Sequence, residues 1–171
     1  YKSYAEALSI HANFLFSLEK ESFKKLKGFY SEKSNLQFDV ILDQEYSFTN
    51  ELKSLYNVFI IKNNSYFTTI AKAVSASKVF VASNIKTLFF GSLMPKKSTL
   101  IELVPDGMNC ITFQDLIKGK FDVNYVVLKS KDEKCRCNDS ENLTCYFQQK
   151  HQYEKIDKKT LFKMISDSMK L

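Results

Sequence analysis

The sequence predicts an α/β protein with a central parallel β-sheet. Most of its apolar runs are nearly continuous rather than alternating between apolar and polar residues, which is typical of parallel strands that helices cover on both faces. A chain of 171 residues, 44% of them apolar, can bury one core of this kind. The five runs that we expect to form strands are residues 38–42, 57–61, 78–82, 99–104 and 123–128.

Four helical segments separate these runs, at residues 47–56, 65–77, 84–94 and 112–119. Ser65 is a candidate N-cap of the second helix, and Pro95, which has no N–H group, ends the third. Three- and four-residue spacing predicts the buried faces of the first two helices. These faces consist of Phe48, Leu52 and Leu55 in the first helix and of Tyr66, Ile70, Ala73 and Val74 in the second.

Two further segments flank this alternating region. A helix at residues 4–27 is expected to end at Gly28, and a final helix at residues 157–170 follows a charged, cysteine-containing loop. The apolar side of the final helix is formed by Ile156, Leu161, Phe162 and Ile165. We therefore expect residues 1–36, a Rossmann-like core at 37–130 and a tail at 131–171 to pack as one domain, with about five strands and crossover helices.

The charge balance indicates no particular partner. The net charge of +6 comes almost entirely from lysines, with Arg136 as the single arginine, so we expect a solvated basic surface and no nucleic-acid partner. A basic module that contacts nucleic acid through its lysines is the weakest of the alternatives. No apolar stretch approaches the ~20 residues of a membrane span. Because the chain starts at Tyr1 rather than Met, we expect it to be a fragment or a processed product.

Ligands of doubly wound sheets bind at the carboxyl ends of the strands, where helix N-termini favour anions. These ends are Asp43-Gln44, Lys62-Asn63, Ser83-Asn84 and Pro105-Asp106. The backbone N–H groups of Ser83 and Asn84 could receive a phosphate. Alternatively, Ser83 is a simple N-cap and nothing binds there.

Several short segments within residues 38–130 occur in an order found in a known family. They are Asn50-Glu51-Leu52, Tyr66-Phe67 through Ala76, Val79 to Ala82, Leu88-Phe89-Phe90, Leu93-Met94-Pro95 and Ile101 to Pro105. Together they resemble the C-terminal core of family-61 glycosyltransferases. In that family an "NEeEL" helix start comes first, and a later strand leads into an "HGAGL" loop, an "lF" segment, and then "lP" and "viElvP".

The resemblance implies the donor-binding, Rossmann-like half of a GT-B glycosyltransferase. Such an enzyme transfers a hexose or pentose from a nucleotide sugar to a protein or glycan hydroxyl without a metal cofactor, and a domain upstream of Tyr1 would supply the acceptor site. By position, the donor-binding residues are Ser83, Asn84, Ile85, Lys86, Thr87 and Glu102.

The donor loop departs from the family pattern. Its histidine is absent, the bulkier Asn84 and Ile85 replace small residues, and Lys86 is the one cation that would compensate for missing arginines. The second hypothesis is therefore a non-catalytic pseudo-glycosyltransferase that acts as a binding or scaffold domain. The resemblance assigns no catalytic residue.

Four carboxylates need an explanation under either hypothesis. Asp43, Glu45 and Asp106 are candidate general bases or ordinary loop carboxylates. Glu102 stands inside an apolar run, so we expect it to reach solvent, a ligand hydroxyl or a helix N-terminus rather than remain buried without a partner.

The cysteines and glycosylation sequons favour an oxidising lumen, in the endoplasmic reticulum or Golgi. Disulfides are the favoured state of the cysteines. Free thiols, or zinc held with His151 at a spacing that matches no common zinc finger, are the alternatives. The residues concerned are Cys110, Cys135, Cys137 and Cys145, and the sequon asparagines Asn63, Asn138 and Asn142.

Overall fold

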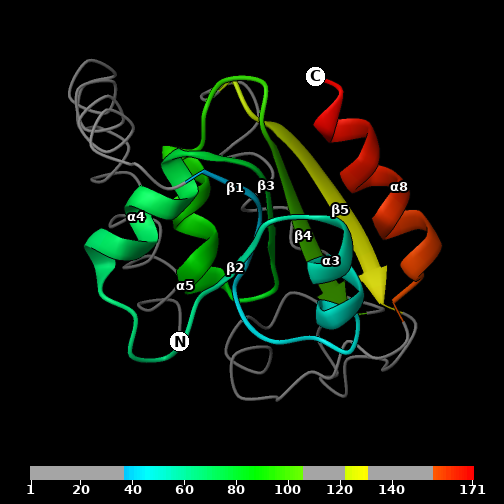
Figure 1. Ribbon diagram of the computed structural model, residues 1–171, viewed down its shortest axis with the longest axis horizontal. Coiled ribbons are helices and arrows are strands. Elements are labelled where there is room, and N and C mark those ends of the chain that lie inside the picture. The colour runs from blue at the N-terminus through cyan, green and yellow to red at the C-terminus, as the bar shows by residue number, and fades with distance from the viewer. Residues whose placement is uncertain (1–36, 106–121, 131–155) are drawn as a thin grey trace, which may run out of the picture.

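The computed structural model describes residues 37–105, 122–130 and 156–171, and within them five parallel strands form one sheet in the order β2-β1-β3-β4-β5 (Figure 1). The predicted parallel α/β fold is thereby confirmed. The strands are β1 (Phe38–Leu42), β2 (Val58–Ile60), β3 (Ser77–Ala82), β4 (Thr99–Pro105) and β5 (Asn124–Ser130). The helices are α3 (Thr49–Leu55), α4 (Phe67–Ser75), α5 (Ile85–Leu88), the 3₁₀ helix η1 (Phe89–Leu93) and α8 (Lys158–Met169).

The helices cover both faces of the sheet, with α4, α5 and η1 on one face and α3 and α8 on the other (Figure 1). The chain runs outward from β1 to β2 and then returns across β1 to form β3. Because right-handed crossovers in opposite directions place their helices on opposite faces, α3 and α4 are separated by the sheet. The direction in which successive strands are added reverses between β1 and β3. The gap between the carboxyl ends of these two strands is therefore the topological switch point, where such folds bind ligands.

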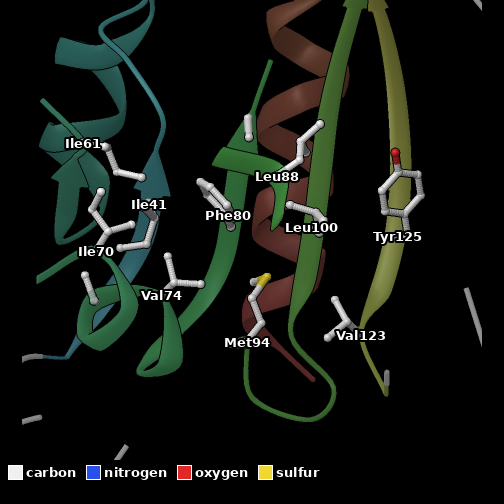
Figure 2. Packing of buried hydrophobic residues seen from close by; sticks show 12 residues of the cluster. Ile41, Ile61, Ile70, Val74, Phe80, Leu88, Met94, Leu100, Val123 and Tyr125 are labelled. Atoms are coloured by element: carbon white, nitrogen blue, oxygen red, sulfur yellow. The ribbon is translucent and has the colours of Figure 1, made fainter. Parts of the chain in front are cut away.

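One core fills the space between the sheet and α4, α5 and η1. Ile41, Phe80, Leu100 and Tyr125 are register partners across four strands and point to this face as one row (Figure 2). Ile70 and Val74 of α4 pack against the row in the same cluster.

The second core lies under α3 and α8. Leu52 of α3 and Leu161 and Ile165 of α8 are fully buried against Val79 and Ile101 of the sheet. Helix α8 begins at an N-cap, Asp157, whose carboxylate accepts hydrogen bonds from the backbone N–H and the hydroxyl of Thr160.

Three details differ from the sequence pattern. Leu55 is 61% exposed because it is the last residue of the short helix α3, and Tyr66 is 79% exposed because it precedes α4 on extended backbone. Tyr66, not Ser65, is the N-cap residue of α4, since the Ser65 hydroxyl accepts a bond from the Lys62 N–H instead. The predicted helices at 4–27 and 112–119, and the cysteine-containing loop, lie outside the described residues.

Gly91 of η1 allows this helix to approach the sheet closely. A Cβ atom at this position would lie 2.6 Å from Cδ2 of Leu100, which is fully buried and cannot move aside freely. We expect Gly91→Ala to lower the free energy of unfolding by about 1–3 kcal/mol through overpacking. Urea unfolding measures the change, with Thr68→Ala on the exposed side of α4 as the control. Equal urea midpoints for Gly91→Ala and Thr68→Ala would contradict the close approach of η1 to the sheet.

Candidate functional site

Asp43 directly follows β1 and lies at the switch point. Its N–H donates to the Val81 carbonyl at 3.1 Å, which continues the β1–β3 ladder by one residue and places Asp43 beside Ala82. Ala82 is in turn the register partner of Glu102. Because neighbours in register point to the same face, the Asp43 and Glu102 side chains flank the small Ala82 side chain on the α4 and α5 face.

The Asp43 carboxylate is 7% exposed and is surrounded by hydrogen-bond donors. Its Oδ2 atom accepts bonds from the backbone N–H groups of Ser83 at 2.8 Å and Asn84 at 2.7 Å, and lies 3.1 Å from the Thr87 hydroxyl. Its Oδ1 atom accepts a bond from the Tyr46 hydroxyl. The carboxylate therefore caps the start of α5 from another strand.

The surrounding side chains form a consistent chain of donors. Nε2 of Gln44 donates to Oγ of Ser83 at 3.2 Å, and the hydroxyl oxygens of Ser83 and Tyr46 are 2.9 Å apart. The Ser83 hydroxyl also lies 3.4 Å from Oδ2 of Asp43. The Tyr46 and Ser83 hydroxyls are therefore within hydrogen-bond distance of each other and of the carboxylate.

Burial raises the pKa of the Asp43 carboxyl above its ordinary value, because the cost of desolvating the charge exceeds the stabilisation by its donors. The bonds from Tyr46, Asn84, Ser83 and Thr87 act in the opposite direction and lower the pKa in part. In either protonation state, Oδ2 remains an acceptor for the two backbone amides.

The structure gathers three residues of the predicted donor loop, Ser83, Asn84 and Thr87, around Asp43. Ile85 and Lys86 form the first turn of α5. The sequence analysis identifies Asp43 only as a candidate base or loop carboxylate and does not single out Tyr46. The available signal was the pair of polar strand ends, which becomes a contact only once β1 and β3 are known to be adjacent.

Glu102 differs from the sequence expectation. Its side chain is 2% exposed within β4, and its carboxyl accepts a hydrogen bond from the hydroxyl of Tyr125 on β5 rather than reaching solvent or a helix N-terminus. Desolvation raises the pKa of Glu102 to about 8. The carboxyl is therefore largely neutral at pH 7 and is a buried hydrogen-bonding group.

Of the other sequence-predicted residues, Glu45 and Asn63 are exposed. Asp106, His151, the four cysteines, Asn138 and Asn142 lie outside the described residues. Within the three described ranges, no group of three His, Cys, Asp or Glu side chains is arranged to hold a metal ion, and no helix is long and apolar enough to cross a membrane.

Comparison of the chain with known protein families gave no match, and comparison with curated proteins gave none either. The geometry of the switch point therefore carries the functional argument.

Replacing Asp43 tests its role as the cap of α5. Asp43→Ala leaves the Ser83 and Asn84 amides without their acceptor, so we expect the free energy of unfolding to fall by about 2–4 kcal/mol. Asp43→Asn should lose less, because its amide oxygen can still accept from both N–H groups. Glu45→Ala, at an exposed neighbour, is the matched control. If Asp43→Ala unfolds at the same urea concentration as the control, the carboxylate does not stabilise the start of α5.

The raised pKa of Glu102 predicts that the free energy of unfolding depends on pH. Between the ordinary pKa of 4.5 and about 8, the folded protein keeps a proton that the unfolded chain has lost. Stability should therefore fall as pH rises through this window, by up to about 5 kcal/mol. Glu102→Gln should match the wild type near pH 5 and exceed its stability near pH 9.

Urea unfolding at a series of pH values measures this difference, with Glu45→Gln as the control for an exposed carboxylate. Parallel stability curves for the wild type and Glu102→Gln would show that Glu102 does not keep its proton on folding.

Proposed function

We propose that this chain is a non-catalytic domain of glycosyltransferase-like architecture that acts as a binding or scaffold domain. The observation that carries the proposal is the occupation of the Ser83 and Asn84 amides by the Asp43 carboxylate. These are the groups that a donor diphosphate would need at the position of the family's glycine-containing loop.

Charge supports the same conclusion. A phosphate oxygen bound to these amides would take the place of Asp43 Oδ2 and bring a negative charge next to an ionised carboxylate. Two like charges about 4 Å apart repel by roughly 1–4 kcal/mol at effective dielectric constants between 80 and 20. Moving Asp43 away would relieve the repulsion. It would also separate the carboxylate from the Tyr46 and Thr87 hydroxyls that now stabilise it.

Glu102 adds an independent argument. In the resemblance this carboxylate belongs to the donor site, whereas here it is buried and bonded to Tyr125. A donor hydroxyl would have to compete with that bond, so Glu102, like Asp43, already has a partner within the protein.

An active glycosyltransferase half remains the alternative prediction. It would take a nucleotide sugar and a protein or glycan acceptor, without a metal, in the lumen of the endoplasmic reticulum or Golgi. An active enzyme of this kind requires Asp43 to move away from the Ser83 and Asn84 amides when the donor binds, so ligand binding is the decisive measurement.

Thermal unfolding in the presence of UDP and UDP-sugars separates the two proposals. At about 5 mM ligand, a donor with a dissociation constant of about 0.1 mM would add about 2 kcal/mol to the free energy of unfolding, a shift of several degrees in Tm. We expect no shift for the wild type or for the exposed-site control Glu45→Gln. A saturable rise in Tm, accompanied by release of UDP from a UDP-sugar, would overturn the non-catalytic proposal.

A further inference from the structure

A tight turn at residues 62–65 joins β2 to α4. The Ser65 N–H donates to the Lys62 carbonyl at 2.9 Å, and the Lys62 N–H donates to the Ser65 hydroxyl oxygen at 3.0 Å. Asn63 and Asn64 are the two central residues of the turn, and both are exposed. The two bonds close the turn at its base and leave the Asn63 side chain at its tip.

The same four residues contain the sequon Asn63-Asn64-Ser65, in which a carboxamide and a hydroxyl are two positions apart. We propose that Asn63 is a site of N-linked glycosylation, with a lipid-linked oligosaccharide diphosphate as the sugar donor. The Asn63 amide nitrogen forms the bond to C1 of the first sugar and loses one proton. The C1–O bond to the lipid diphosphate breaks, and the lipid diphosphate is the leaving group.

Two neighbouring aromatic side chains support this placement. Tyr66 is 79% exposed and Phe67 is 59% exposed, and the Phe67 ring is held against Phe90 with 5.1 Å between ring centroids. The chain from Asn63 spans at most about 11 Å to Tyr66 and about 14 Å to Phe67, so a sugar on Asn63 lies within reach of these rings. The C–H face of a pyranose ring can cover them, which accounts for two large apolar side chains at the surface beside this turn.

The position of the glycan also matters for the switch point. Ile61 donates its N–H to the Leu42 carbonyl at 2.8 Å, so the chain just before the turn lies beside the residue that precedes Asp43. A glycan on Asn63 would therefore lie at the carboxyl ends of the strands, as Asp43 does. The inference does not depend on the proposed function, since an active or an inactive domain can carry it.

Secretion of the full chain from cultured mammalian cells behind an added leader tests the site. Digestion with peptide N-glycosidase in heavy-oxygen water, followed by peptide mass spectrometry, labels each asparagine that carried a glycan. This distinguishes Asn63 from Asn138 and Asn142 in one sample. We expect the label at Asn63 in the wild type and in Asn64→Gln, and its loss in Asn63→Gln and Ser65→Ala.

Ser65→Thr is the matched control, because it keeps both the sequon and the hydroxyl that accepts from the Lys62 N–H. It should retain the glycan, whereas Ser65→Ala loses it. Secreted, folded wild-type protein with an unlabelled Asn63 would overturn the inference. The UDP titration would be unaffected by that result, so failure of one proposal does not imply failure of the other.

Discussion

The Asp43 carboxylate joins the two halves of the sheet at their switch point. After β1 the chain turns to one face and after β3 to the other, and the Ser83 and Asn84 amides follow directly after β3, at the start of α5. Asp43 accepts from both amides across 40 and 41 positions of sequence. Helix α5 has only four residues, too few to be stable alone, so its placement depends on this cap and on the packing of Leu88.

This constraint links stability to function. At the switch point, where other doubly wound proteins bind an anionic ligand, the backbone amides here bind the Asp43 carboxylate of the same chain. The amides serve one acceptor at a time, and the intramolecular acceptor is always present at high effective concentration. A ligand at these amides would have to displace a carboxylate that the Tyr46 and Thr87 hydroxyls also contact, so binding there would remove the cap of α5.

Local patterns predicted the elements of the fold but not the contacts of the site. The five strands and the helices α3, α4, α5 and α8 lie where apolar patterns along single segments predict them. The same pattern included Leu55 and Tyr66 because periodicity does not show where a helix ends. The Asp43 to Ser83 contact depends on which strands are adjacent, and β2 rather than β3 follows β1 in the chain. No spacing between residues 43 and 83 encodes that adjacency.

Two buried acids in one row of the sheet differ because of their places along the strands. Asp43 lies just past the end of β1, where the neighbouring strand has also ended and its next backbone amides are available as donors. Glu102 lies within β4, paired on both sides by β3 and β5, so the ladders use the surrounding amides and only a side chain can donate to it. Tyr125 meets that need with one hydroxyl, which does not offset the desolvation of a charge, and the neutral acid is favoured. Desolvation raises the pKa of both acids, and position along the strand decides how many groups donate to each: four residues to Asp43, which caps α5, and Tyr125 to Glu102.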